Sequence, residues 1–363
     1  MKPKFGKTIL EKRFGDLNQT KKKIVKDSIT EYSGADKLDE ILTITDKKIY
    51  NAKIVVEEED QDKALAKKYL DSLRMDLSIP PRVPHKDLTK EQYKKIEAIV
   101  FNEWKRINNS KIFERNLEIW RQFWLTCEKA DVIVQIVDSR NPQFFVNEDI
   151  STMYPTKKHI LLSNKSDLTT RRVDTEGYDV YYYSATSENT VLNFLLDLDC
   201  STIGFIGYPN VGKSSTINAI VNDKRVRVSK TPGKTKHIQT IKLSDTKTLI
   251  DCPGLVFPKH NKTDLLLHGV LNVDTILDLK SSLYQIIKFI GIYKLNKFYS
   301  LPMFENDSRY PVEINFLNNM ADHKQWSTTT CLKNIVKDLC SGDIQYERIE
   351  EELNLKNSFK WME

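Results

Sequence analysis

The sequence predicts an α/β protein: one nucleotide-binding parallel sheet, preceded by a helical region and followed by a small, mostly helical domain. Five apolar runs between residues 130 and 254 each end in polar residues or glycine. Parallel sheets place buried strands and their ligands in this way. A proline cluster at residues 77–85 interrupts helix formation, and after Pro258 the strand-like runs give way to helical spacing.

Residues 1–75 are predicted to form a basic, charged and partly disordered extension. Like charges cluster at residues 21–23, which are lysines, and at residues 57–59, which are glutamates. So few apolar residues lie between them that this stretch cannot bury enough surface to fold alone. Two interpretations stay open: a solvated tail, or a basic arm that becomes ordered on RNA or on another protein. The net charge of +6 is compatible with nucleic-acid contact without demonstrating it.

Residues 76–129 are predicted to be a helical region with helices at 89–107 and 110–129. Apolar side chains recur at helical spacing in both segments. They are Tyr93, Ile96, Ile99, Val100 and Trp104 in the first, and Phe113, Leu117, Trp120 and Trp124 in the second. Such an aromatic stripe is more often packing than ligand contact, so we expect it to lie against the sheet that follows.

The predicted nucleotide-binding domain covers residues 130–258. Its strand-like runs are, in order, ADVIVQIVDSRNP, KKHILLSNKSD, YDVYYYSA, STIGFIGYPNVGKS and TKTLIDCPG. Residues 259–363 form the predicted C-terminal helical domain, in which the strongest helical segments are LLLHGVL, SSLYQIIKFIGI and TCLKNIVKDL. Because the carboxyl ends of parallel strands share one edge of a sheet, the polar ends of the five runs should gather there.

Residues 207–214, GYPNVGKS, match the phosphate-loop pattern GxxxxGK[ST] between an apolar strand and a helical segment. Small residues let backbone N–H groups surround phosphates at the N-terminus of a helix. Lys213 should reach the β- and γ-phosphates, and Ser214 should bind Mg²⁺. The residues expected to contact the nucleotide here are Gly207, Asn210, Val211, Gly212, Lys213, Ser214 and Ser215.

A second phosphate-sensing motif, DCPG, follows the strand TKTLI. Asp251 can hold a Mg²⁺-bound water, and Gly254 can offer its N–H to the γ-phosphate. Between the two motifs, Thr235 could complete the Mg²⁺ shell when GTP is bound, with Thr231 as its competitor. The expected catalytic residues are therefore Lys213, Thr235 and Gly254, and the expected metal ligands are Ser214, Thr235 and Asp251.

The motif NKSD directly follows the strand-like run HILLS and is expected to recognise the base of the nucleotide. Asp167 can accept hydrogen bonds from the N1–H and the exocyclic amine of guanine, a donor pair that adenine lacks, which points to GTP or GDP. The alternative is an ordinary turn at a strand end, for which Asn, Ser and Asp are common. Asn164 and Lys165 belong to the same motif. Ser184 and Ala185 would supply a backbone N–H toward the guanine O6.

The order of these motifs is circularly permuted. NKSD and Ser184–Ala185 precede the phosphate loop and DCPG, whereas a conventional GTPase begins with the phosphate loop. The DCPG motif then leads directly into the C-terminal domain, so the nucleotide state could reposition the flanking regions.

The residue after DCPG is Leu255, where many GTPases place a glutamine that orients water. Leucine cannot polarise water, so we expect slow intrinsic hydrolysis and completion of the site by a partner or a cation. Asn210 is a candidate K⁺ ligand, because an amide oxygen at this position would face the phosphates. An asparagine favoured by the turn explains this residue equally well.

These residues resemble the circularly permuted GTPases of ribosome assembly. The motif order, Leu255 and DSRNP at residues 138–142 are features of that family. Outside the nucleotide-binding domain, SIPPRVP, FNEWKR, FERNLEIWRQFW and CLKNIVKDLCSGDIQYE resemble its eukaryotic cytoplasmic large-subunit branch. Members of that branch carry a long insertion between the guanine motif and the Ser-Ala motif, whereas only sixteen residues separate Asp167 from Ser184 here.

The resemblance implies a GTPase that acts in late cytoplasmic maturation of the large (60S) ribosomal subunit and promotes release of the nuclear export adaptor. It implies GTP or GDP with Mg²⁺ as cofactors, with K⁺ as a further candidate. Its implied partners are the rRNA and ribosomal proteins of the large subunit and the export adaptor, and its implied location is the cytoplasm, with shuttling to the nucleus. Two alternatives stay open: a nucleolar or organellar permuted GTPase acting at an earlier step, and a scaffold that binds GTP without hydrolysing it.

Composition argues against other classes of protein. We expect no membrane contact, because no apolar stretch is long enough to cross a bilayer. The five cysteines are scattered and form no CxxC pair, which favours reduced thiols. Glu11 and Asp16 count against a mitochondrial presequence, which should be poor in acidic residues. The expectation is a soluble monomer.

Overall fold

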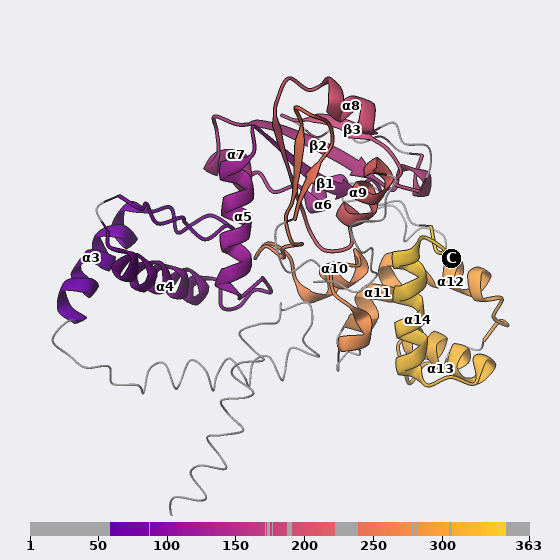
Figure 1. Ribbon diagram of the computed structural model, residues 1–363. Coiled ribbons are helices and arrows are strands. Elements are labelled where there is room, and N and C mark those ends of the chain that lie inside the picture. The colour runs from indigo at the N-terminus through magenta and orange to yellow at the C-terminus, as the bar shows by residue number, and fades with distance from the viewer. Residues whose placement is uncertain are drawn as a thin grey trace, which may run out of the picture.

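The protein is described here by a computed structural model. It describes residues 59–345 except for 87, 171, 173–174, 176, 187–190, 222–238, 277–278, 280–281 and 305–306. Within these residues the chain forms N-terminal helices, a central sheet and a group of C-terminal helices (Figure 1). None of the described helices is long and apolar enough to cross a lipid bilayer.

The N-terminal part consists of α3 (Glu59–Ser72), α4 (Lys90–Ile107) and α5 (Leu117–Lys129). Helix α3 lies at the end of the stretch predicted to be a charged extension, whose residues 1–58 are outside the described part of the chain. Helix α4 follows the prediction, because Thr89 and Gln92 form a capping box at its start. The predicted helix at 110–129 is wrong in its first turns, because α5 begins only after Asn116. The Asn116 side chain caps the helix by accepting from the Glu118 N–H at 2.9 Å.

The aromatic stripe packs against the sheet in part: Trp104, Phe113, Trp120 and Trp124 lie in the core that includes the sheet, whereas Tyr93, Ile96 and Val100 pack in a separate cluster around Val83. The stripe also contacts the proline cluster. The indole of Trp104 donates to the Leu77 carbonyl at 3.0 Å, and that of Trp124 donates to the Pro80 carbonyl at 3.1 Å. Both tryptophans are fully buried in the core that includes the sheet. A buried indole N–H needs an acceptor, and the non-helical segment around the prolines supplies one to each.

The sheet has six strands in the order β3-β2-β1-β4-β6-β5. The strands are β1 (Val132–Asp138), β2 (Lys158–Asn164), β3 (Asp179–Tyr182), β4 (Thr202–Ile206), β5 (Gln239–Lys242) and β6 (Thr248–Asp251). The five predicted strands are all present and run parallel. The edge strand β5, antiparallel to β6, was not predicted because Ile241 is its one buried residue and no apolar run marks it.

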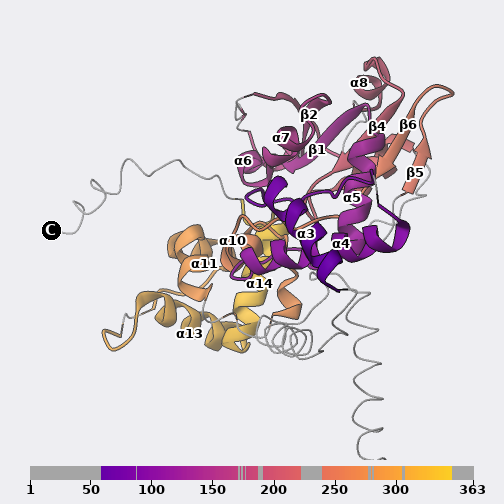
Figure 2. The ribbon, with the colours of Figure 1, turned by 90° about the vertical axis from the view of Figure 1, so that its left-hand side faces the viewer.

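Short helices connect the strands. They are α6 (Pro142–Phe145), α7 (Asp149–Met153), the 3₁₀ helix η2 (Ser166–Leu168), α8 (Val191–Asp197) and α9 (Lys213–Val221). Helix α5 covers one face of the sheet and α8 and α9 lie on the other (Figure 1), and the view in Figure 2 places β5 and β6 at one edge. This layering is that of an α/β nucleotide-binding domain.

Within the described residues the C-terminal part is mostly helical, as predicted, although the predicted segment LLLHGVL is helical only as far as Leu267. This part consists of α10 (Lys262–Leu267), the 3₁₀ helix η3 (Val273–Thr275), α11 (Leu283–Ile290), α12 (Ile292–Tyr299), α13 (Val312–Lys324) and α14 (Thr328–Ser341). Gly291, with φ +91°, divides the predicted segment SSLYQIIKFIGI into two helices. Helix α10 contributes Leu265 to the core of the sheet and Leu266 to the core of the C-terminal helices, so the two parts pack continuously.

Candidate nucleotide-binding site

The predicted motifs meet at the carboxyl ends of the strands, because five parallel strands end on the same side of the sheet. Strands β1, β2 and β4 lie side by side in parallel register, and β6 pairs with β4. The chain segments that follow them carry DSRNP, NKSD, the phosphate loop and DCPG. Motifs separated by nearly ninety residues of sequence, from Asn164 to Asp251, therefore line a common edge, which is where open α/β sheets bind ligands.

The phosphate loop requires glycine at both positions where the sequence predicts it. Gly207 has φ +146°, and a Cβ there would lie 2.6 Å from the Ile136 carbonyl oxygen. Gly212 has φ +100°, and a Cβ there would lie 2.1 Å from the amide nitrogen of Asn164. The loop therefore approaches both its neighbouring strand and the guanine motif too closely for any side chain.

Asn164 of the guanine motif joins three loops. Its Nδ2 donates to the Val211 carbonyl in the phosphate loop at 2.9 Å, and its Oδ1 accepts from the Ala185 N–H at 2.9 Å. The side chain is buried, so both hydrogen bonds are shielded from water. Of the Ser184–Ala185 backbone N–H groups predicted to supply a donor toward the guanine O6, that of Ala185 already donates to Asn164. The neighbouring Ser184 hydroxyl pairs with that of Thr186 at 2.8 Å.

Lys213 lies folded back on its own loop. Its ammonium donates to the carbonyls of Gly207 at 2.9 Å and Tyr208 at 2.7 Å. Burial lowers the pKa of Lys213 to about 8, although the nearby carboxylate of Asp251 opposes that shift. The side chain is therefore positioned inside the phosphate loop, where a phosphate oxygen could replace the carbonyls as its partner.

Asp251 is a buried carboxylate whose hydrogen-bonding capacity is unused within the described residues. Neither of its oxygens has a hydrogen-bond partner there, and the residue is 0% exposed. Burial raises the pKa of Asp251 to about 6, with Lys213 acting in the opposite direction. A buried acid of this kind requires a partner, and a hydrated divalent cation matches oxygen donors beside a phosphate loop.

The remaining predicted residues lie around these groups. A Cβ on Gly254 would be 3.2 Å from the Lys213 ammonium and 3.0 Å from the Pro209 backbone, so DCPG lies against the phosphate loop. Ser214 and Ser215 are half-buried in the first turn of α9, and Val211 is buried. Asp167 is exposed in η2. Thr235 and its competitor Thr231 lie outside the described residues.

Asn210 connects the phosphate loop to the C-terminal part. It takes the left-handed conformation with φ +62°, and its Nδ2 donates to the Gly269 carbonyl at 2.8 Å. The amide oxygen is the atom that a K⁺ ion would need, so the contact and cation binding are compatible. The phosphate-loop pattern marks Asn210 in the sequence, but no local pattern marks its contact with the C-terminal part, because the two residues are 59 positions apart.

The segment after DCPG is buried between the phosphate loop and the N-terminal helices. Leu255 is fully buried, and its N–H donates to the Gly207 carbonyl at 3.2 Å. The ring of Phe257 lies 5.3 Å from that of Tyr208 and 5.7 Å from that of Trp120. The sequence predicts a connection from DCPG to the C-terminal domain. The structure shows a second connection, from the segment after DCPG to α5 through Phe257 and Trp120.

The sheet order, the phosphate loop and the preceding guanine motif define the fold class: a P-loop nucleotide-binding domain with circularly permuted GTPase motifs. Residues 202–295 match the family model described as 50S ribosome-binding GTPase. Among curated proteins, the chain is similar to Large subunit GTPase 1 of Schizosaccharomyces pombe (strain 972), with 38% identity over 268 residues that cover 53% of this chain and 43% of that protein. The resemblance stated from the motifs is thus confirmed.

A second relative is Large subunit GTPase 1 of Saccharomyces cerevisiae, with 34% identity over 288 residues that cover 57% of this chain and 45% of that protein. The chain therefore spans less than half the length of these relatives. Among solved structures, the GDP-bound structure of TM YlqF matches with 20% identity and a TM-score of 0.43, over 63% of this chain and 99% of that one.

Proposed function

We propose that this chain binds GTP with Mg²⁺ and hydrolyses it. The observation that carries the proposal is the position of Asn164, which ties the guanine motif to both the phosphate loop and the Ser-Ala loop. A single side chain thereby fixes the base-reading and phosphate-binding loops relative to each other. Preformed loops of this kind reduce the ordering cost of ligand binding.

In this proposal each residue of the site has a separate role in binding the base, the phosphates or the metal. Asp167 reads guanine, and the Lys213 ammonium exchanges the carbonyls of Gly207 and Tyr208 for phosphate oxygens. Ser214 and Asp251 would hold Mg²⁺, which supplies charge compensation for the phosphates when bound. Thr235 would complete the metal shell, and Gly254 would offer its N–H to the γ-phosphate.

Hydrolysis by the isolated chain is slow in this proposal. Leu255 has no polar atom in its side chain and is fully buried, so it cannot orient the attacking water. A partner, or a K⁺ ion bound by the amide oxygen of Asn210, would complete the site. This is the same logic by which transition-state charge is stabilised in trans in other GTPases.

We further propose that the chain acts in maturation of the large ribosomal subunit. Support comes from the family description of residues 202–295 and from the names of the relatives. The specific proposal is a late cytoplasmic step on the 60S particle, at which a monomer of this chain promotes release of the nuclear export adaptor. The basic net charge of +6 is of the sign that rRNA contact requires.

GTP turnover measured with and without purified large ribosomal subunits tests the proposal. We expect stimulation by the subunits, and a further difference between K⁺ and Na⁺ buffers if Asn210 binds the cation. Lys213→Ala should abolish nucleotide binding or turnover under every condition, because the phosphates lose their buried counter-charge. Unchanged turnover in that variant would refute the assignment of the site.

The burial of Leu255 favours one further candidate function, a GTP-binding scaffold that does not hydrolyse. GTP binding without turnover, with and without subunits and in both salts, would select the scaffold. An earlier assembly step is separated by location: a purely nucleolar or organellar signal for the tagged protein would contradict the late cytoplasmic step.

A further inference from the structure

A buried cluster of charges lies beside the guanine motif, at the end of β1. The Oδ2 atom of Asp138 accepts from Lys165 Nζ at 2.7 Å and from Arg140 Nη2 at 2.7 Å. Its Oδ1 accepts from Arg140 Nε at 3.0 Å. The side chains of Asp138 and Arg140 are 2% and 3% exposed. One carboxylate therefore holds two cations, one of which belongs to NKSD.

The carboxylate stays ionised in this environment. Burial by itself raises the pKa of Asp138, but the charges of Lys165 and Arg140 outweigh it and hold the pKa well below its ordinary value. Hydrogen bonds between charged groups are stronger than those between neutral groups, and the Asp138 carboxylate is buried although the Lys165 side chain is 24% exposed. The cluster is accordingly a strong connection between β1 and the guanine motif.

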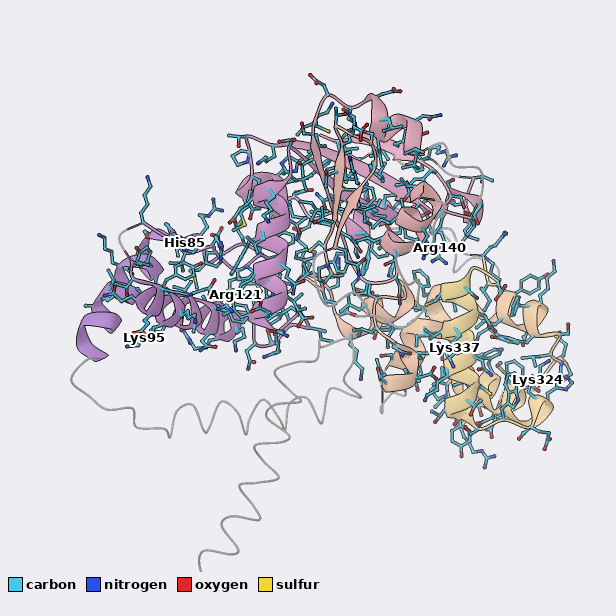
Figure 3. The ribbon with its side chains drawn as sticks, in the orientation of Figure 1. His85, Lys95, Arg121, Arg140, Lys324 and Lys337 are labelled. Atoms are coloured by element: carbon cyan, nitrogen blue, oxygen red, sulfur yellow. The ribbon has the colours of Figure 1, made fainter. Side chains whose placement is uncertain are left out.

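Arg140 extends the cluster to the C-terminal part. Its Nη1 donates to the Leu339 carbonyl at 2.8 Å, and its Nη2 lies 3.5 Å from the Cys340 carbonyl. These carbonyls belong to the last turn of α14, where a helix carries a partial negative charge, and the Leu339 carbonyl accepts from the Gly342 N–H at 3.3 Å as well as from Arg140. Figure 3 shows Arg140 on the side of the sheet that faces α14, on which Lys337 is labelled.

Packing brings the same two elements together at a second point. Gly342 follows α14 with φ +93°, and a Cβ there would lie 2.8 Å from the methyl carbons of Leu168. Leu168 is the residue directly after NKSD and the last of η2. The end of α14 thus contacts the guanine motif through Leu168 and is linked to it through Arg140 and Asp138.

Lys165 needs such support because of its backbone. It has φ +63°, a left-handed conformation that is unfavourable for a residue with a side chain. This conformation turns the chain so that Asp167 follows in η2. A side chain anchored on Asp138 stabilises that turn, and therefore the position from which Asp167 meets the base.

We propose that Asp138 is a positioning residue that couples guanine recognition to docking of α14. Its carboxylate fixes Lys165 on one side and Arg140 on the other, so that an ordered guanine motif and a docked α14 stabilise each other. Coupling of this kind is reciprocal: nucleotide binding should tighten the end of α14, and loosening that end should weaken nucleotide binding. The inference rests on the proposed binding of GTP and GDP.

Asp138→Asn tests the proposal, because it removes the charge while keeping the shape. We expect the affinity for GDP to fall by about tenfold or more, as for loss of a buried charged hydrogen-bond partner. In the unmodified chain, GDP should slow hydrogen exchange of the backbone amides at 339–342, and in the variant this effect should disappear. Arg140→Lys keeps the charge but cannot span the carboxylate and α14, so it should lose the exchange effect with a smaller loss of affinity.

A double-mutant cycle separates positioning from a general structural role. With Lys165→Met already present, Asp138→Asn should add little further loss of GDP affinity, because the contact that links the carboxylate to the guanine motif is already gone, although Arg140 still pairs with it. If the two substitutions instead lowered GDP affinity independently, so that the double variant lost the product of the two single losses, the proposal would be overturned. Should Asp138→Asn fail to fold, the exchange experiment on the unmodified chain and on Arg140→Lys decides: no GDP-dependent protection at 339–342 would overturn it equally.

The matched control is Asp274→Asn. Asp274 also pairs with α14, through Lys337 at 2.9 Å, but from η3 rather than from the sheet. GDP affinity and the protection at 339–342 should stay as in the unmodified chain, and a loss equal to that of Asp138→Asn would overturn the specific role. An unmodified chain that binds no GDP would instead refute the proposed function, so the two failures are distinguishable.

Discussion

At the scale of single residues, Lys213 and Asp251 are two ionisable groups buried near each other at the proposed phosphate site. Both side chains are buried, and neither oxygen of Asp251 has a hydrogen-bond partner among the described residues. Burial moves the two pKa values toward each other, to about 8 and about 6. A site that is incompletely satisfied without its ligand is expected where phosphates and a metal complete it.

Asp251→Asn should change the pH dependence of stability in the nucleotide-free protein. The folded-state pKa of about 6 is above the ordinary value of 3.8, so the contribution of Asp251 to stability is complete below about pH 4 and is lost as the pH rises through 6. Between pH 4 and pH 7 the unmodified chain should lose on the order of 1–3 kcal/mol relative to the variant. Denaturant unfolding at several pH values measures this. Parallel pH profiles would contradict the assignment.

Asp167→Asn should relax the preference for guanine toward xanthine. The amide can donate to the second exocyclic oxygen of xanthine, whereas the carboxylate accepts from the amine of guanine. Competition between GDP and XDP for the purified variant measures the switch. Asp179→Asn is the control, since Asp179 is also exposed but lies at the start of β3 rather than in the site. Full retention of the preference for GDP in Asp167→Asn would show that NKSD does not read the base.

At the scale of elements, the segment that follows DCPG joins the phosphate loop to α5. Phe257 is 1% exposed and packs edge-on against Tyr208, Trp120 and Phe123. The Val256 carbonyl accepts from the Glu114 N–H at 3.0 Å, which fixes the extended chain before α5. Phe257 follows Gly254 by three residues, so a displacement of DCPG would be carried along the chain to this aromatic contact.

Phe257→Ala should lower the free energy of unfolding by about 3–5 kcal/mol, because it opens a cavity among fully buried aromatic rings. Urea unfolding followed by tryptophan fluorescence measures the loss. Phe298→Ala provides the comparison, since that ring is 41% exposed in α12 and its removal should have a much smaller effect. Equal losses in the two variants would argue against the packing role of Phe257.

At the scale of the whole molecule, the permutation places the sheet between two helical parts and connects both to the nucleotide loops. The N-terminal part contacts the segment that follows DCPG through Phe257, and the C-terminal part contacts the phosphate loop through Asn210 and Gly269. Helix α10 contributes to both apolar cores. The chain order thus makes each flank a direct neighbour of a loop that we propose to bind phosphate.

The described parts should unfold in one transition, and guanine nucleotide should raise its midpoint. Shared packing across α10 opposes separate melting of the two cores, and a ligand at 100 times its Kd adds about 2.7 kcal/mol. Scanning calorimetry with and without GDP and Mg²⁺ tests this. Two transitions, of which GDP shifts only one, would show that the flanks are not coupled to the site.

The sequence alone determined the site motifs, their permuted order and five of the six strands, because each depends on local chemistry. Phosphate binding needs small residues and a lysine in one loop, and a buried parallel strand needs a continuous apolar run. The edge strand β5 was not predicted, because three of its four residues are exposed and it contains no continuous apolar run. The start of α5 was misplaced because the Glu114 contact to Val256 overrides local helical spacing.

Only the tertiary structure decided how the loops are joined. Asn164 bonds across 47 positions to Val211, and Arg140 bonds across 199 positions to Leu339. No spacing rule in a single sequence encodes such pairs, because they depend on which strands are neighbours and how closely their ends approach. The motifs indicate the chemistry that we propose for the chain. The contacts formed on folding determine which other parts of the molecule are linked to the proposed nucleotide site.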